Sequence, residues 1–452
     1  MMRATTRAVV SVLLAVATVG AAAQSAAADD DDDRRHEVWA IDQSDTTPDG
    51  GGTLYIYAGG TLAGRSAPSG PAEVIDLGGA ARNLCLAQTG SAPRRPHMLM
   101  FNAGQSHAIV AFVATGHVLF MDAASRAPVR CIDVGMQAHA AFPSPDETYV
   151  VVANQNGKLL QRIATDYGTN SFALDPAATL NLATCATPSG APCENPALRP
   201  DNAPICPQVD ATSRFTFVTL RGGGMFVVDS SATPMSIVGE YDRATVHPNG
   251  CGGVETAGKM YVNSGGGTAA NPLESDLYAF ALGGFSTAPN PPNTPAPALV
   301  FSHDGRGFVD SHGATLTKRD RYLWVADRAA NRIVVVDTRR DTVVNEIDLA
   351  GAVSPDPAPD LMGISPDGNR VYLSLRGPMP LTANVPGVNN AAGSTPGVGI
   401  VRVTRGGRSG RLRAVAPISH VVAGTETADP HALAVRDTDL DGEHEDSDDD
   451  SD

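Results

Sequence analysis

Residues 311–349 read as four short β-strands separated by three tight polar turns, and this pattern sets the fold that we expect. The strands are predicted at Gly313–Thr317, Tyr322–Asp327, Arg332–Asp337 and Thr342–Asp348. β-Branched and aromatic residues fill the strands, while charged residues, Asn and Ala form the breaks between them. Four strands in about 40 residues is the length of one blade of a β-propeller.

The same spacing recurs along the chain. His312 stands fourteen residues before Ala326, which lies in the middle of the second strand. The same interval follows His97, His139 and Asp360. Two degenerate copies begin at Cys206 and at Gly250 or Cys251, which makes six complete units.

A seventh unit is divided between the two ends of the chain. DPHALAVRDTD supplies a first strand from His431, and three strands without a first are predicted at Glu37–Gln43, Thr53–Ala58 and Glu73–Leu77. Joining them would close the ring and remove every sheet edge. We therefore predict an all-β fold, a seven-bladed β-propeller of four-stranded blades closed by the C-terminal strand. An open β-sandwich is the alternative.

Three stretches carry a resemblance to a known family. VADRAANRIVVVDTRRDTVVNEIDL, YVVVANQNGKLL and ISPDGNRVYLS resemble the YVTN-type β-propeller repeat family, and the resemblance covers residues 34–436. It implies the propeller fold. It leaves the function open, because this architecture serves lactonases, oxidoreductases, surface-layer proteins and binding modules. The SPDG turn of the repeat is absent from the third and fourth units.

Two segments interrupt the repeats within the propeller, which is predicted at 37–436. Residues 167–202 follow the second unit, and residues 378–397 lie inside the sixth. Both are rich in Pro, Gly, Asn and Ala, which favours surface loops. Long loops on a rigid scaffold often carry binding.

The N-terminal residues 1–28 have the pattern of an export signal. Arg3 and Arg7 precede an apolar run at Ala8–Gly20, and Ala26–Ala28 forms a small-residue cleavage site. The apolar run is too short to span a bilayer comfortably. We expect a periplasmic or secreted protein without a membrane span.

The formal charge of −16 is concentrated in two acidic runs. These lie in the N-terminal segment 29–36 and in the tail 437–452, which we expect to be disordered. No basic face remains to neutralise phosphates, so no nucleic-acid partner is expected. Asp437, Asp439 and Asp441 match the start of a calcium loop. No helix is predicted beside them, so a solvated tail is favoured over calcium.

The six cysteines form an even number, which in an oxidising compartment makes disulfides the default. Cys206 and Cys251 occupy the same point of neighbouring blades, so a disulfide between them is favoured over metal ligation. Cys185 with Cys193 would then close the inserted loop, and Cys85 with Cys131 would tie adjoining outer regions. Sequence alone does not fix this connectivity.

The repeat alignment predicts a ring of side chains at the mouth of the central channel. The position before each innermost strand holds metal-ligand residue types, and the proposed metal ligands are His97, His139, His312, His431 and Asp360. Such a set suits a transition metal: copper, zinc or iron. The three imidazoles from blades seven, one and two would lie on one side, with His312 and Asp360 across the channel. Alternatively, the ring histidines hydrogen-bond carbonyls or water.

Three functions are compatible with these features. The first is an exported propeller that binds a small molecule or metal ion at the channel mouth through the His-rich ring. The second is an enzyme on the same site, either a metal-dependent oxidoreductase or a lactone hydrolase. The third is a protein-interaction scaffold that uses the inserted loops and has an inert channel. The sequence does not decide whether the protein is an enzyme.

Overall fold

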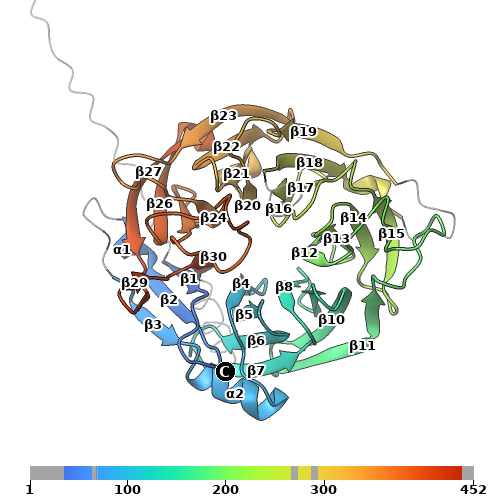
Figure 1. The fold of residues 1–452 in the computed structure, drawn as a ribbon, viewed down its shortest axis with the longest axis horizontal. Coiled ribbons are helices and arrows are strands. Elements are labelled where there is room, and N and C mark those ends of the chain that lie inside the picture. The colour runs from blue at the N-terminus through green and yellow to red at the C-terminus, as the bar shows by residue number, and fades with distance from the viewer. Residues whose placement is uncertain (1–34, 64–67, 69, 266–272, 287–293, 440–452) are drawn as a thin grey trace, which may run out of the picture. The chain divides into compact units, whose positions relative to one another are not determined.

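The computed structural model describes residues 35–63, 68, 70–265, 273–286 and 294–439. Within them the chain forms seven four-stranded antiparallel sheets, arranged as blades in a ring around a central axis (Figure 1). This is the seven-bladed β-propeller that the repeats predict.

Four blades come from the first two thirds of the chain. The first contains β4 (Pro96–Phe101), β5 (His107–Phe112), β6 (His117–Asp122) and β7 (Pro128–Asp133). The second contains β8 (Ala138–Pro143), β9 (Tyr149–Asn154), β10 (Leu159–Asp166) and β11 (Ser171–Asn181). The third contains β12 (Pro204–Val209), β13 (Phe215–Leu220), β14 (Met225–Asp229) and β15 (Ser236–Tyr241). The fourth contains β16 (Gly253–Thr256), β17 (Lys259–Gly265), β18 (Ser275–Ala281) and β19 (Ala298–Ser302).

The remaining blades complete the ring. The fifth contains β20 (Ser311–Leu316), β21 (Tyr322–Asp327), β22 (Arg332–Asp337) and β23 (Thr342–Asp348). The sixth contains β24 (Pro359–Ile364), β25 (Arg370–Leu375), β26 (Gly397–Thr404) and β27 (Ser409–Pro417). The seventh contains β30 (Pro430–Asp437), β1 (His36–Asp42), β2 (Thr53–Ala58) and β3 (Glu73–Asp76). Outside the blades lie β28 (Val421–Val422), β29 (Thr425–Glu426), α1 (Gly59–Ala63) and α2 (Ala80–Thr89).

Pairing between β30 and β1 closes the ring, as predicted. The two strands run antiparallel, with Arg436 opposite Glu37 and Ala434 opposite Trp39. Figure 1 shows the red C-terminal strand beside the blue N-terminal one. All seven blades therefore have their innermost strand paired, and the ring has no open blade.

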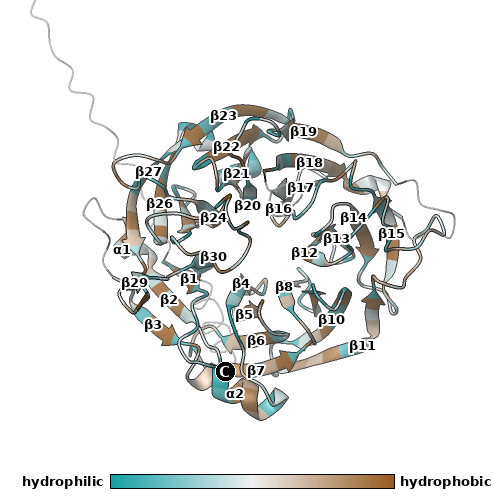
Figure 2. Ribbon diagram, viewed as in Figure 1, coloured by the Kyte–Doolittle hydropathy of each residue, from teal (hydrophilic) through white to brown (hydrophobic). Residues whose placement is uncertain are grey.

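The middle strands are hydrophobic on both faces because each blade packs between two others. In β21, Leu323 and Val325 pack toward the fourth blade with Tyr261. Trp324, the residue between them, packs toward the sixth blade with Leu373. Successive strand residues point to opposite faces, so both faces of a blade become core. Figure 2 shows hydrophobic residues along the strands around the ring.

The three predicted disulfides are present. The structure joins Cys85 to Cys131, Cys185 to Cys193 and Cys206 to Cys251. The first connects α2 to β7 and lies in the core. α2 itself was not expected from the Gly- and Pro-rich composition.

The inserted segments differ from the expectation in one respect. Residues 171–181 of the segment 167–202 form β11, the outermost strand of the second blade, and not a loop. β11 pairs antiparallel with β10, from Ser171 opposite Asp166 to Asn181 opposite Leu159. Residues 376–396 connect β25 to β26, so the predicted insertion 378–397 is a loop up to Gly397, which begins β26.

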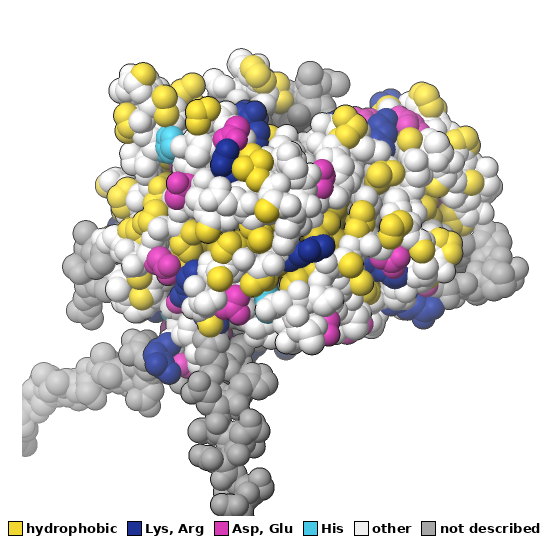
Figure 3. All heavy atoms as spheres, turned by 90° about the horizontal axis from the view of Figure 1, so that it is seen from below, with side chains coloured by type: hydrophobic (Ala, Val, Ile, Leu, Met, Phe, Trp, Pro, Cys, Tyr) yellow, Lys and Arg dark blue, Asp and Glu magenta, His cyan; other side chains and the backbone are white. Residues whose placement is uncertain are grey.

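The expected export signal at 1–28 lies outside the described residues, as do most of the segment 29–36 and of the tail 437–452. Among the described residues, none belongs to a helix long and apolar enough to cross a membrane. Figure 3 shows acidic and basic side chains interspersed on the side that it views, without a basic face there.

Replacing Leu433 by Ala tests the closure. Leu433 of β30 packs with Val38 and Ala40 of β1 and is 5% exposed. Leu433→Ala should lower the free energy of unfolding by about 2–5 kcal/mol, because it opens a cavity at the closing strand pair. Urea titration measures the change. Val421→Ala, at a residue 62% exposed, should change it by less than about 0.5 kcal/mol, and an equal loss in both variants contradicts the prediction.

Candidate functional site

The innermost strand carries a β-bulge in six of the seven blades described. In each of these blades, one residue near the start of the innermost strand pairs with the last residue of the next strand outward. The register shifts immediately after this pair. The residues that follow this pair are His97, His139, Ile205, His312, Asp360 and His431. A bulge redirects the side chain at its position, so the same backbone irregularity places each of them toward the axis.

This register corrects the sequence alignment in the third blade. Ile205 stands where the other blades have His or Asp, and Cys206 is one residue further along. The sulfur of Cys206 points to the neighbouring blade, where it is bonded to Cys251. Neither cysteine is a metal ligand.

The four ring histidines lie in one continuous cluster. The ring centroid of His97 lies 3.8 Å from that of His431 and 4.6 Å from that of His139. The centroids of His312 and His431 lie 5.2 Å apart. His312 was expected across the channel from His431; the channel is narrow enough there that the two rings are in contact.

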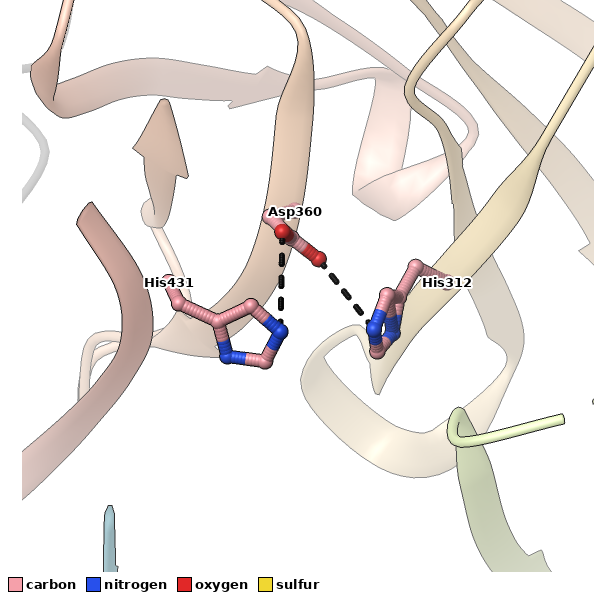
Figure 4. Close-up of side chains that lie close together, drawn as sticks. All are labelled: His312, Asp360 and His431. Carbon is pink, nitrogen blue, oxygen red and sulfur yellow. Dashed lines mark ion pairs between the residues drawn. The ribbon is translucent and has the colours of Figure 1, made fainter. Parts of the chain in front are cut away.

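Asp360 lies between two of these histidines, as Figure 4 shows. Its Oδ1 is 3.6 Å from Nε2 of His312, and its Oδ2 is 3.8 Å from Nε2 of His431. Ligand atoms of these three residues all lie within 4.8 Å of one another, a spacing that can hold a metal ion. All three residues are buried.

Three of the imidazoles are held through Nδ1. Nδ1 of His431 donates to the carbonyl oxygen of His97 at 2.9 Å, and Nδ1 of His139 to that of Ile205 at 2.9 Å. Nδ1 of His97 lies 2.9 Å from Oε1 of Gln43. Nε2 of Gln43 in turn donates to Asp429, which turns Oε1 toward the histidine.

These bonds decide which nitrogen carries the proton. A carbonyl oxygen only accepts, so Nδ1 must be the protonated nitrogen and Nε2 keeps its lone pair. Nε2 of His97 and Nε2 of His431 are buried and have no hydrogen-bond partner among the described residues. Metal-binding histidines have this arrangement, in which an oxygen fixes one nitrogen and the other binds the ion.

The histidines are neutral at pH 7. Burial lowers the pKa of His139 to about 4 and that of His431 to about 3. Burial, with repulsion from His431 and His139, holds the pKa of His97 well below its usual range. Burial and the charge of Arg328 do the same for His312. Neutral imidazole is the form that binds a metal.

Asp360 is ionised despite its burial. Burial alone would raise its pKa, but His312, Arg328, His431 and Arg376 outweigh burial and hold the pKa well below its usual range. Nη1 of Arg376 donates to Oδ2 at 2.7 Å, and Nη1 of Arg328 lies 3.4 Å from the same oxygen. The site thus keeps a buried carboxylate facing two imidazoles.

Both arginines follow the second strand of their blades, a position that the sequence analysis did not single out. Arg376 also forms two hydrogen bonds to Asp429, and Arg328 forms two to Asp310. The signal was present in the sequence, because Arg328 and Arg376 both stand sixteen residues after a ring residue.

The loop between β25 and β26 lies over this cluster. The backbone N–H of Leu381 donates to Asp429 at 2.7 Å, and the carbonyl oxygen of Thr382 accepts from Arg376 at 2.9 Å. Beside the loop is a cavity of about 290 Å³, lined by His139, His312 and residues of several other blades. The cavity therefore reaches two of the ring histidines from outside.

A second group of potential ligands lies in the fourth blade. Nδ1 of His247 is 2.7 Å from Oδ2 of Asp276 and 3.3 Å from Oδ2 of Asp304. A hydrogen bond to Asp276 raises the pKa of His247 to about 9 despite opposing desolvation. The group is therefore an ion pair around a protonated imidazole.

The calcium loop considered at the C-terminus is only partly described. Asp437 is the last residue of β30, and Asp439 pairs with Arg35 at 3.2 Å. Asp441 lies outside the described residues.

Comparison with known proteins supports the fold. No family model and no curated protein matches the chain, so the resemblance to YVTN-type repeats stays a prediction. Among solved structures, the periplasmic gluconolactonase PpgL of Pseudomonas aeruginosa is 14% identical with a TM-score of 0.55, covering 88% of this chain and 99% of that one.

Two other structures align over a similar length. A protein from Lactobacillus plantarum is 11% identical with a TM-score of 0.54, covering 89% of this chain and 99% of that one. A putative 6-phosphogluconolactonase from Bacteroides fragilis is 11% identical with a TM-score of 0.53, covering 90% of this chain and 99% of that one. At these identities the comparison shows a common propeller fold.

The buried neutral imidazoles predict acid sensitivity. His139 has a pKa of about 4 in the folded protein against 6.5 ordinarily, so the unfolded chain binds its proton more readily. Its contribution to stability is present above pH 6.5 and is lost as the pH falls toward 4. Between pH 6.5 and 4.5, the metal-free protein should lose about 2 kcal/mol more than His139→Gln. Urea titrations at both pH values measure this difference, and parallel pH profiles contradict it.

Proposed function

We propose that this protein is an exported propeller that binds one transition-metal ion at the channel mouth. His312, Asp360 and His431 are the central ligands. His97 and His139 continue the cluster beside them through ring contacts, and we propose that they are further ligands. The observation that carries the proposal is the fixed tautomer of His97, His139 and His431, which leaves Nε2 unprotonated in each. Among the described residues, Nε2 of His97 and Nε2 of His431 are also buried without a hydrogen-bond partner, which histidines that only filled a polar channel would not need.

The donor set favours copper, zinc or iron. Imidazole nitrogens with one carboxylate suit these metals, whereas calcium and magnesium prefer oxygen donors alone. The His312 side of the cluster faces the cavity. An ion held here would therefore keep an open position toward a ligand, as catalytic metal sites do.

An oxidising compartment outside the cytoplasm fits the chain best. The three disulfides require an oxidising environment to persist. Residues 1–28, with the pattern of an export signal, would direct secretion. We propose that the protein resides in the periplasm or the extracellular medium.

Metal analysis tests the proposal directly. Protein purified without a His tag, stripped and then incubated with Cu²⁺, Zn²⁺ or Fe²⁺, should retain about one equivalent of one of them after dialysis, measured by elemental analysis. His312→Ala combined with His431→Ala should reduce the retained metal below about 0.1 equivalent, since both Nε2 donors are lost.

His420→Ala is the matched control. His420 lies outside the ring and is only partly buried, so its loss should leave the retained metal unchanged. Circular dichroism and urea titration establish that each variant is folded. Full metal retention by the folded double variant, or no retention by the unmodified protein, would overturn the proposal.

Lactone hydrolysis is the second candidate function. The cavity brings a ligand beside His139 and His312, whose neutral imidazoles can accept a proton from water. Two of the fold's structural neighbours carry lactonase names. Acid release from δ-gluconolactone above the uncatalysed rate, lost in the His312→Ala, His431→Ala variant, is the expected result. A rate equal to the uncatalysed one excludes this substrate.

A further inference from the structure

The cavity at the channel mouth carries positive charge. Three arginines line it, Arg95, Arg221 and Arg328, and no Asp or Glu is among its lining residues. Arg328 is compensated by Asp310, and Arg221 by Asp201 at 2.6 Å. The guanidinium of Arg95 forms no ion pair with any described residue, although Oδ1 of Asp45 accepts its backbone N–H, and the residue is only partly buried. A guanidinium without an ion-pair partner in a concave site favours an anionic ligand.

Two amide side chains that line the same cavity have unused hydrogen-bonding capacity. Gln155, 7% exposed, and Asn249 both line the cavity, and neither side-chain amide forms a hydrogen bond with a described residue. Each offers a donor and an acceptor. A carboxylate can use only the donors. A hydroxyl group can use both, because it also donates.

We infer that the cavity binds a small organic anion that carries hydroxyl groups, with the anionic group at Arg95 and the hydroxyls at Gln155 and Asn249. An amine would satisfy the amide oxygens as well, but the arginines repel it. An uncharged polyol would leave Arg95 without a partner. This inference names the class of ligand for the site proposed above. It rests on the proposed function only in placing a metal ion near the bound anion.

Three four-carbon probes separate the contributions: tartrate carries charge and hydroxyls, succinate charge only, and threitol hydroxyls only. Isothermal titration of the full-length exported chain, metal-free and metal-loaded, should show tartrate binding about tenfold more tightly than succinate. Threitol should not bind. Because the metal-free protein is measured separately, failure of metal binding and failure of anion binding are distinguishable.

Two variants assign the contacts. Arg95→Gln should weaken tartrate and succinate alike by about tenfold or more, since a hydrogen bond to a charged group is lost. Gln155→Met, of similar size but apolar, should weaken tartrate to near the affinity of succinate and leave succinate unchanged. Arg413→Gln, at an exposed arginine of the outermost strand β27, is the control and should bind as the unmodified protein does.

The competing outcomes are distinct. Equal affinities for tartrate and succinate overturn the role of the hydroxyls, and no binding of tartrate in either metal state overturns the inference as a whole. Equal weakening by Arg95→Gln and Arg413→Gln also overturns it, because the effect would then follow net charge and not position.

Discussion

The antiparallel pairing of β30 with β1 is the constraint on which the molecule depends. It joins residues from the two ends of the described chain, with Glu37 opposite Arg436. A propeller blade without its innermost strand would expose sheet edges and leave one sector of the channel wall missing. The same strand delivers His431. The histidine cluster is therefore complete only when β30 has closed the ring.

The cluster is built at a cost to stability. Four imidazoles are held neutral in a buried site, and Nε2 of two of them, His97 and His431, has no hydrogen-bond partner in the described part of the chain. Unpaired buried polar atoms are unfavourable, and structures keep them mainly where they serve a function. Asp360 with Arg376, Asp429 and Arg328 forms a fully buried ion network that fixes the carboxylate in front of the imidazoles. Such networks favour a defined geometry more than they favour stability.

Neighbouring blades contribute unequally to the channel mouth. Blades one, two, five, six and seven supply the metal-ligand types, while the third blade supplies Ile205 and the disulfide of Cys206. The cavity is lined by Ile205 and Cys251 of this sector, by His139 and Arg221, and by Leu381 and Thr382 of the loop between β25 and β26. Because His312 also lines it, a ligand in the cavity would lie directly beside the proposed metal ligands.

The sequence by itself determined the number of blades and the closing strand, because both follow from the spacing of residues within a repeat. It favoured the three disulfide pairings without fixing them, and the structure decided the connectivity. It also placed His97, His139, His312, Asp360 and His431 at one register. It misplaced Cys206 by one residue, because the fourteen-residue interval was counted back from Leu220, whereas the structure shows that Thr219 is the equivalent of Ala326.

Only the tertiary structure decided which of these residues meet, and in what chemical state. The hydrogen bond from His431 to the carbonyl oxygen of His97 joins residues 334 positions apart, and no spacing within a repeat can reveal it. Spacing within a repeat also cannot reveal the contacts of Asp360 with Arg376 and Arg328. Arg376 approaches Asp360 from the same blade, and Arg328 approaches it from the neighbouring blade. Protonation state depends on burial and on charges across the channel, so it is a property of the closed ring and not of any single repeat.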